Sequence, residues 1–439
     1  MNRRLKPFTV IILGFAGVIF LGSCLLTLPV SSAAGVWTSF STASFTATSA
    51  VCVTGLVVRD TGTYWSAFGQ TVILIMIQIG GLGVVSMAAL LAMAAGKKIS
   101  LRHRNLLEET ISTHQIGGIV RMLRFVICTT FIVELVGALL MMPVFYGKYG
   151  AHGIWIACFQ SVSAFCNAGM DLMGSKTGPF SSMTSLRGNG YIVTVVTSLI
   201  VIGGIGFLTW DDVRNKRHHL RKYRMQSKVA LCMTAALILG PAMFLYYTEF
   251  AAAPGNERVW LALFQAVTPR TAGFNTADYS TFTGAGKAMT IVLMLIGGCP
   301  GSTAGGMKTT TAAVLIANVL SVSRREKHAH MFGRRIEDDV VKTASALMLL
   351  YVFATIGGAL IICLEEHCHF GSAVFETASA VGTVGLTLGL TPEIGHLSRI
   401  VLMVLMFFGR VGGLTLIYAA LSDQSTEGDK YPVEKIIVG

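Results

Sequence analysis

Four short segments of this chain end in glycine and are rich in threonine, valine and alanine, and their backbones could bind a cation. Extended backbone of this kind presents a row of carbonyl oxygens, which can replace the hydration shell of a metal ion. Glycine suits such a segment because it adopts dihedral angles that are closed to other residues. The four glycines are separated by 114, 104 and 112 residues. The segments are Val51, Cys52, Val53, Thr54 and Gly55; Phe165, Cys166, Asn167, Ala168 and Gly169; Pro269, Arg270, Thr271, Ala272 and Gly273; and Val381, Gly382, Thr383, Val384 and Gly385.

An anion pathway and simple helix packing are the alternatives to a cation site. An anion pathway would line its constriction with several Arg or Lys side chains, whereas Arg270 is the only basic residue in the four segments. Small residues also let helices pack closely in membranes, and this explanation stays open for the glycine pairs at 80–81, 203–204, 297–298 and 412–413. Packing alone does not explain four glycine segments at near-equal spacing. We therefore expect these segments to surround one axis.

The composition indicates a protein that crosses a membrane several times. Of the 439 residues, 53% are hydrophobic and only 13% are charged, whereas a soluble domain usually carries about 25% charged residues. The nine cysteines are scattered and form no Cys-x-x-Cys pair, which argues against a disulfide framework or a zinc site. This composition excludes a soluble enzyme. The sequence also contains no Ser-His-Asp or paired-carboxylate arrangement that would indicate an enzyme in the membrane.

Eight apolar stretches are long enough to cross a bilayer, which takes about 20 residues. The first could instead be a cleaved signal peptide, but its apolar core exceeds the roughly 7–15 residues of such a peptide. Between the members of each successive pair lies a shorter, semi-apolar stretch that ends in one of the glycine segments. We therefore predict an all-α membrane protein with four membrane-helix–pore-helix–membrane-helix repeats around a single central pore. The eight stretches are 9–30, 67–95, 117–142, 190–210, 229–248, 286–320, 340–363 and 397–421.

Basic residues mark one side of the predicted membrane protein. Of the 34 Lys and Arg residues, 24 lie in the N-terminus, in three linkers and in the C-terminal tail. The positive-inside rule makes these parts, and both termini, cytoplasmic. The basic run 214–224 is therefore a topology signal that could also contact anionic membrane lipid or an acidic partner, and no nucleic-acid partner is expected. The predicted division is 1–96 for repeat 1, 97–213 for a cytoplasmic linker and repeat 2, 214–323 for a linker and repeat 3, 324–421 for a linker and repeat 4, and 422–439 for a cytoplasmic tail.

The second helix of the third repeat is predicted to be interrupted. Five glycines and one proline lie within 297–309, and such a composition does not continue a regular helix. A phosphate-binding loop is the competing interpretation, but Met307 separates Gly306 from Lys308 and no soluble strand precedes the loop. The predicted unwound stretch comprises Gly297, Gly298, Cys299, Pro300, Gly301, Ser302, Thr303, Ala304, Gly305, Gly306 and Lys308.

Three charged residues stand out within the apolar stretches. Arg410 interrupts the last helix near its middle, where a charge costs at least about 2.5 kcal/mol and needs a polar partner or cavity. Arg270 precedes the third glycine, and Glu376 is a candidate partner for it. Glu134 is a lone acid in the third stretch, and its function stays open.

The sequence resembles the Trk/Ktr/HKT superfamily of potassium transporters, and most closely the KtrB-type membrane subunit of bacterial Ktr uptake systems. The resemblance extends from Thr9 to Leu421 and rests on four motifs: Val-Cys-Val-Thr-Gly-Leu at 51–56, Phe-Gln-Ala-Val-Thr-Pro-Arg-Thr-Ala-Gly-Phe-Asn at 264–275, Gly-Ser-Thr-Ala-Gly-Gly-Met-Lys at 301–308 and Gly-Thr-Val-Gly-Leu-Thr at 382–387. It implies a homodimer in the bacterial cell membrane with a cytosolic nucleotide-binding regulatory ring of the KtrA type. It also implies that the unwound stretch is a gating loop with Arg410 nearby. In this family a filter glycine in all four repeats goes with potassium preference, whereas a serine in the first repeat goes with sodium permeation. Position 55 is glycine, so the resemblance implies a preference for potassium.

Together these features predict potassium uptake through a selectivity filter of backbone carbonyls, gated by the loop and Arg410. K⁺ is then the substrate, the filter is the only metal site, Na⁺ is an activator or coupling ion, and no covalent cofactor is expected. A sodium- or proton-coupled secondary cation transporter is the alternative, since internal repeats and broken helices mark that class as well. Such a transporter would need an acid in the membrane, and Glu134 is the lone candidate.

Overall fold

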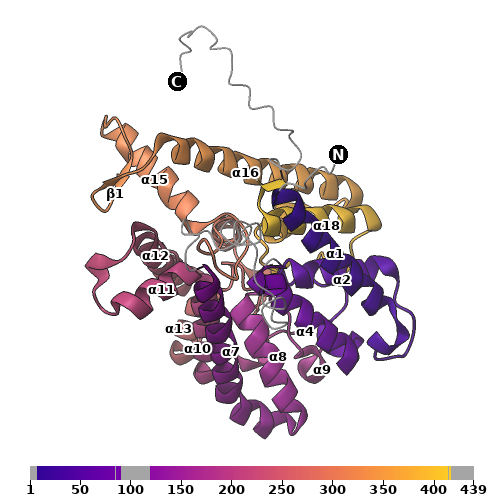
Figure 1. Ribbon diagram of the computed structural model, residues 1–439. Coiled ribbons are helices and arrows are strands. Elements are labelled where there is room, and N and C mark those ends of the chain that lie inside the picture. Colours follow the sequence, from indigo (N-terminus) through magenta and orange to yellow (C-terminus); the bar gives the residue numbers. More distant parts are fainter. Residues whose placement is uncertain (1–6, 85, 90–118, 414, 417–439) are drawn as a thin grey trace.

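The structure is a computed structural model that describes residues 7–84, 86–89, 119–413 and 415–416, and it is largely helical in these ranges (Figure 1). The expectation of an all-α protein needs one correction, because an antiparallel hairpin of β1 (His330–Met331) and β2 (Arg334–Arg335) lies between two helices. The predicted tail 422–439 and residues 97–118 of the first predicted linker lie outside the described residues.

The described helices repeat one pattern along the chain, in which a first helix is followed by a short helix and then by a second helix. The first half of the chain contains α1 (Pro7–Thr27), α2 (Phe40–Val51), α3 (Thr61–Tyr64), α4 (Ala67–Leu82), α7 (Ile119–Tyr149), α8 (His152–Cys166), α9 (Gly174–Thr177), α10 (Gly190–Gly204) and α11 (Phe207–Lys216). The second half contains α12 (Met225–Thr248), α13 (Gly255–Val267), α14 (Gly284–Leu295), α15 (Thr309–Ser323), α16 (Asp338–Glu366), α17 (Phe370–Val381) and α18 (His396–Val411).

Several helices are suited to crossing a membrane by their length and composition. Within the described ranges these are four unbroken helices, in α1, α7, α12 and α16. The predicted stretch 190–210 is not straight, because α10 and α11 meet at an angle of 95°. The predicted stretch 286–320 is divided into α14 and α15, so the interruption that the glycines and the proline predict is present.

Polar caps fix where the shorter helices begin. The side chains of Ser39, Ser66, Asn189 and Thr283 accept hydrogen bonds from backbone amides in the first turns of α2, α4, α10 and α14. Each cap satisfies an amide that would otherwise lack a partner at the helix start. This matters most in an apolar surrounding, where water cannot replace the missing bond.

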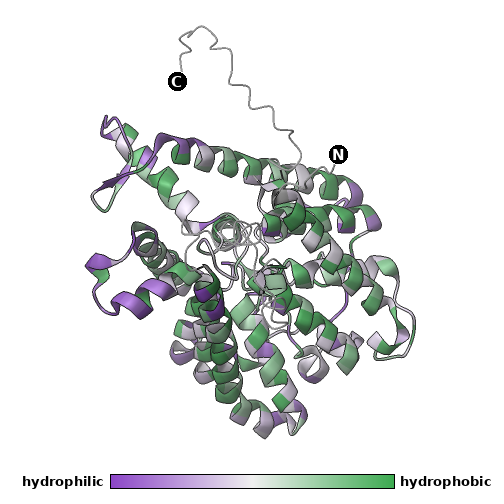
Figure 2. Ribbon diagram, in the orientation of Figure 1, coloured by the Kyte–Doolittle hydropathy of each residue, from purple (hydrophilic) through white to green (hydrophobic). Residues whose placement is uncertain are grey.

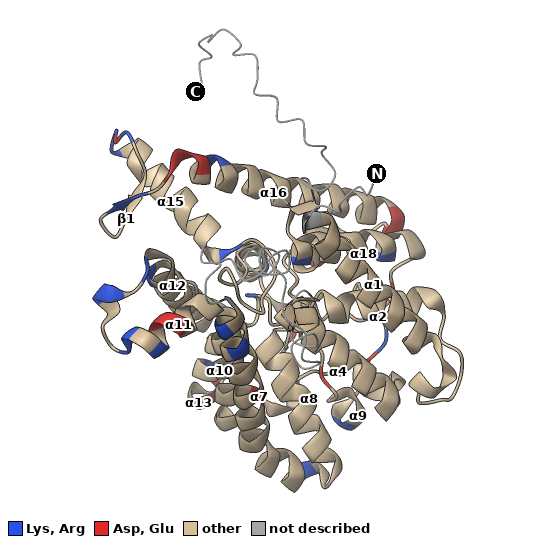
Figure 3. Ribbon diagram, in the orientation of Figure 1, with Lys and Arg blue, Asp and Glu red and all other residues tan. Residues whose placement is uncertain are grey.

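The outer surface of the helices is apolar, whereas polar residues gather at the linkers (Figure 2). Leu21, Leu135, Leu239 and Phe353 are more than half exposed, which suits contact with lipid chains. Charged residues cluster at the end of α11 and around the β1–β2 hairpin (Figure 3). In the first of these clusters Asp212 holds the basic linker, because it accepts hydrogen bonds from Ser227 and Lys216.

In three of the four repeats, a glycine in the second helix packs against the end of the short helix. A Cβ atom on Gly80, Gly203 or Gly409 would collide with the carbonyl oxygen of Val51, Phe165 or Val381, respectively. These glycines therefore serve close packing, which is the explanation that the sequence left open for mid-helix glycines. The contact joins each short helix to the second helix of its own repeat.

We predict that Gly203→Ala destabilises the protein. The added methyl group forces α8 and α10 apart, and overpacking of this kind typically costs about 1–3 kcal/mol. Gly357→Ala in α16 is the matched control, since no atom of the described residues lies within 4 Å of the Cβ it would add and alanine favours a helix. Thermal unfolding of the purified protein in detergent, followed by intrinsic fluorescence, measures the difference. Equal midpoints for the two variants would contradict the packing role.

Candidate functional site

The four glycine segments form a closed ring. A Cβ on Gly55 would lie 2.6 Å from the carbonyl oxygen of Ala168, and one on Gly169 would lie 2.9 Å from that of Ala272. In the same way Gly273 abuts the carbonyl oxygen of Val384, and Gly385 abuts that of Thr54. Each segment thus touches the next in the order of the chain, and the fourth touches the first.

The backbone of every segment repeats one unusual conformation. The glycines have φ values of +92° (Gly55), +64° (Gly169), +79° (Gly273) and +93° (Gly385). The residue two positions earlier is also left-handed, although it is not glycine. Left-handed backbone costs an L-residue about 1–2 kcal/mol, and such strain marks functional sites. These residues are Val53 (φ +56°), Asn167 (φ +59°), Thr271 (φ +73°) and Thr383 (φ +51°).

Short helices end where the ring begins. The helices α2, α8, α13 and α17 end at Val51, Cys166, Val267 and Val381. A helix C-terminus carries about half a negative charge from its free carbonyl groups. Four such termini next to the ring produce a negative potential there, which favours a cation and disfavours an anion.

Buried oxygens in the ring lack partners among the described residues. They are the side-chain oxygens of Thr54, Asn167, Thr271 and Thr383, all buried and without a hydrogen bond. A buried unpaired oxygen costs about 1–3 kcal/mol, so a site that leaves several of them calls for an outside partner. A cation or an ordered water would supply one.

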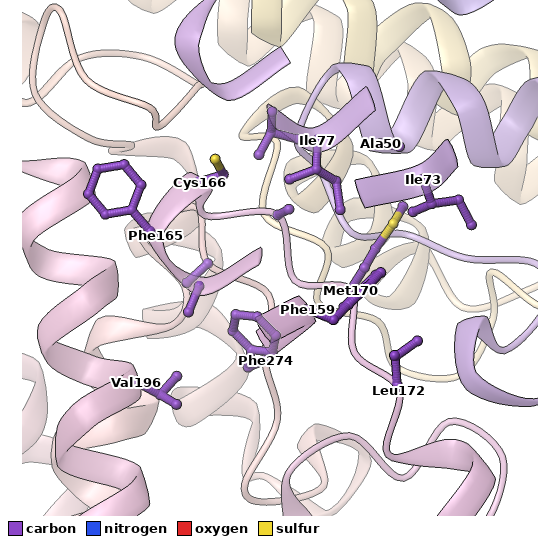
Figure 4. Close-up of a cluster of buried hydrophobic side chains, with 14 of the residues drawn as sticks. Ala50, Ile73, Ile77, Phe159, Phe165, Cys166, Met170, Leu172, Val196 and Phe274 are labelled. Atoms are coloured by element: carbon purple, nitrogen blue, oxygen red, sulfur yellow. The ribbon is translucent and has the colours of Figure 1, made fainter. Parts of the chain in front are cut away.

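Apolar side chains hold the second segment from behind (Figure 4). Phe165 and Cys166 lie in one buried cluster with Ile73 and Ile77 of α4 and Val196 of α10. Such a cluster excludes water and fixes the backbone that it surrounds. The segment is therefore a rigid part of the core and not a surface loop.

The interrupted stretch forms a loop whose two ends are hydrogen-bonded together. The amide of Gly297 donates to the carbonyl of Met307 over 2.8 Å, and the amide of Thr309 donates to that of Gly298 over 3.0 Å. The loop is anchored to the bend between α10 and α11, because Cys299 donates to the carbonyl of Gly204 over 2.9 Å. The bend and the loop therefore stabilise each other.

The loop contacts two opposite segments of the ring. The Thr303 hydroxyl donates to the carbonyl of Phe165 over 2.9 Å and accepts a bond from the Asn167 amide over 3.0 Å, both in the second segment. On the other side a Cβ on Gly305 would collide with the side chain of Thr383 in the fourth segment. Since the second and fourth segments face each other across the ring, the loop passes across its axis.

Arg410 and Lys308 hold the loop by hydrogen bonds to backbone carbonyls. The Arg410 guanidinium donates to the carbonyls of Thr303, Gly80 and Gly81. Lys308 donates to the carbonyl of Ala304 over 2.8 Å and to that of Gly305 over 3.3 Å. The polar partners that the half-buried Arg410 needs are thus carbonyl groups, and in the described ranges it forms no salt bridge. Two basic side chains consequently lie beside the loop.

The expected pairing of Arg270 with Glu376 is wrong. The Glu376 carboxylate accepts bonds from Thr387 and Thr391, each over 2.6 Å, and from the amide of Leu388. Its role is to fix the chain after the fourth segment. Arg270 is only 8% exposed and points toward α12, where it reaches the Thr234 hydroxyl over 3.5 Å.

Glu134 lies directly behind the second segment. It is 4% exposed, and it accepts a hydrogen bond from Gln78 of α4 over 3.1 Å and a weaker one from the Cys166 thiol. The sequence left its function open, and the structure joins it to a ring residue. Within the described residues no group of three or more His, Cys, Asp or Glu side chains could hold a metal ion.

Serines that support the ring were missed by the sequence analysis. The hydroxyls of Ser49 and Ser379 accept the amide hydrogens of Gly55 and Gly385, each over 3.0 Å. Ser163 instead donates to the carbonyl of Met170 over 2.6 Å. A signal for them existed, because a serine precedes three of the four glycines by six residues. No sequence pattern of this kind indicated that Val53, Asn167, Thr271 and Thr383 are left-handed.

Comparisons with known proteins agree with this arrangement. Residues 6–427 match the family TrkH, described as "Cation transport protein". The chain is 37% identical to the "Potassium/sodium uptake protein NtpJ" of Enterococcus hirae, over 100% of this chain and 98% of that protein. It is 36% identical to the "Ktr system potassium uptake protein B" of Bacillus subtilis, over 99% and 97%.

A solved structure shares the fold. The crystal structure of the potassium transporter TrkH from Vibrio parahaemolyticus matches with a TM-score of 0.74, covering 96% of this chain and 86% of that chain. At 19% sequence identity this match concerns the fold alone. Together with the full-length sequence matches, it leads to one conclusion: the chain belongs to the TrkH family of cation transport proteins, which are membrane transporters and not enzymes.

Proposed function

We propose that this protein takes up potassium through the ring of glycine segments, which acts as a selectivity filter. The observation that carries the proposal is the closed contact of Gly55, Gly169, Gly273 and Gly385. Carbonyl groups around one axis replace the water shell of a cation. The names of the two relatives, which refer to potassium and to potassium/sodium uptake, support the choice of ion.

The filter selects cations by its backbone and its surroundings. The C-termini of α2, α8, α13 and α17 make the potential negative, and Arg270, the only basic residue of the four segments, is directed toward α12. Selection between potassium and sodium depends on the ring keeping its dimensions. The close contacts of the four glycines, where no side chain fits, support a fixed geometry.

The loop at 297–308 and Arg410 form the gate in this proposal. The loop contacts the second and the fourth segments and so lies across the axis. Arg410 adds positive charge beside it, which repels a potassium ion that approaches the loop. Movement of the loop would break its bonds to Phe165, Gly204 and Arg410 and open the pathway.

The topology and the partners of the protein are inferred from the family resemblance and from the distribution of Lys and Arg residues. We place four repeats around one pore, divided at residues 96, 213 and 323, with the basic linkers and both termini in the cytoplasm of a bacterial cell. The protein would act as a homodimer with a KtrA-type nucleotide-binding ring. The words "Ktr system" in the name of one relative support such a partner.

A sodium- or proton-coupled transporter is the second candidate. Glu134 supports it, because this acid is buried in α7 and bonded to a filter residue, which is where a coupling ion would act. The name of the Enterococcus hirae relative, which includes sodium, fits both candidates.

We predict that Gly55→Ser lowers the preference for potassium over sodium by about tenfold or more, which corresponds to a loss of roughly 1.4 kcal/mol. The serine Cβ would meet the Ala168 carbonyl at 2.6 Å, and its backbone would be strained at φ +92°. Potassium and sodium flux into liposomes measures the ratio, and Gly357→Ser, which meets no neighbour, is the control. An unchanged ratio of potassium to sodium flux would show that the ring glycines serve packing and not ion selection.

We predict that deleting 300–306 raises potassium flux by about tenfold or more while the ion preference is kept, since this removes a barrier of at least roughly 1.4 kcal/mol. Arg410→Gln should act in the same direction because it frees the Thr303 carbonyl. Arg399→Gln in the same helix is the control, as the Arg399 side chain donates to the carbonyl of Ile394 and to no other atom of the described residues. The same liposome flux reports the result, and a loss of flux in well-folded variants would show that the loop is not a barrier.

We predict that Glu134→Gln leaves potassium uptake close to the wild-type rate and without a new dependence on sodium or pH. Glutamine fills the same space and still accepts the bond from Gln78. Uptake under imposed sodium and proton gradients separates the two candidates. Abolished uptake, with potassium binding intact, would instead favour the coupled transporter.

A further inference from the structure

An apolar groove lies between α12, the end of α15 and the β1–β2 hairpin. It encloses about 220 Å³, and its walls include Met233, Ala313 and Leu320. A water molecule occupies about 30 Å³ in the liquid, so the groove has room for about seven groups of that size. This is enough for part of a hydrocarbon chain.

The groove opens onto the outer surface of the protein. Ile316 and Phe332, which line it, are each 52% exposed, and Cys232 in its wall is exposed as well. Water would find few hydrogen-bond partners along these walls, and a cavity holds water only where it offers several. An apolar occupant fits them better.

One end of the groove carries an arginine whose side chain has no partner among the described residues. Arg324, Glu326 and His330 line this end, and the His330 ring lies 3.2 Å from the Glu326 carboxylate. Arg324 forms no salt bridge or side-chain hydrogen bond with the described residues. It lies directly after α15 ends at Ser323, and the hairpin that follows also carries Lys and Arg residues (Figure 3).

We infer that this groove binds an anionic phospholipid, with one acyl chain between α12 and α15 and the phosphate on Arg324. A guanidinium binds a phosphate through two parallel hydrogen bonds. A free phosphate would leave the apolar walls uncovered, and an uncharged hydrocarbon would leave Arg324 unpaired. Residues 324–335, which include the hairpin, hold five Lys or Arg and one Glu, and this surplus of positive charge selects a headgroup of net negative charge over a zwitterionic one.

Such a lipid would act on the end of the loop described above. The loop leads directly into α15, which begins at Thr309, and the lipid sits between α15 and α12. An occupied groove therefore resists displacement of α15 relative to α12. This consequence for gating rests on the proposed function, whereas the binding of the lipid does not.

Binding is tested on the full chain in vesicles of phosphatidylcholine with and without phosphatidylglycerol, by native mass spectrometry of the retained lipids. Arg324→Gln should lower the affinity for phosphatidylglycerol by about tenfold or more and leave phosphatidylcholine nearly unchanged. Arg325→Gln removes the same charge one residue away, outside the groove lining, and should keep the lipid. Equal losses of phosphatidylglycerol affinity in the two variants would mean that the lipid is attracted by the general surface charge and not by Arg324, and would overturn the proposal.

A second variant tests the acyl chain. Ala317 lines the groove, so Ala317→Phe should fill it and displace phosphatidylglycerol while Arg324 is kept. Retained lipid in this variant would overturn the proposal, as would efficient crosslinking of Cys232 between two copies by a short bismaleimide, because a second copy would then cover the groove. Potassium flux is recorded separately, so lipid binding can be established even where the transport proposal fails.

Discussion

The buried, non-helical backbone of the four glycine segments is the constraint on which the structure depends. The ring at Gly55, Gly169, Gly273 and Gly385 cannot hold itself, because its backbone is left-handed at alternate residues and is not part of a helix. Rigid surroundings must therefore impose its shape. Caps such as Ser39, supports such as Ser49 and the apolar cluster behind Phe165 provide that rigidity.

The third repeat departs from the other three at one place, and this difference explains the loop. Gly80, Gly203 and Gly409 let their helices pass close to a short helix. The second helix of the third repeat is instead unwound from Ile296 to Lys308. Its free backbone groups bond to the bend after α10, to Phe165 and to Arg410, so the buried polar groups of several repeats satisfy one another.

Local sequence patterns predicted the elements, whereas contacts between repeats were beyond them. The apolar stretches, the short helices and the interruption near Pro300 follow from hydropathy and from helix-breaking residues. The bend after α10, the left-handed Val53 and the carbonyl partners of Arg410 depend on segments far away in the chain. The predicted pair of Arg270 and Glu376 failed for this reason, since opposite charge alone does not place two side chains together. The ion, the gate and the partners stay predictions.

The order of contacts around the ring has a consequence for its symmetry. All four segments belong to one polypeptide and no two have the same sequence, so the ring is only approximately fourfold. A single substitution alters one quadrant, whereas in an assembly of four identical subunits it would alter all four. Ion preference can therefore change in small steps during evolution, with each quadrant adjusted independently while the other three keep the pathway intact.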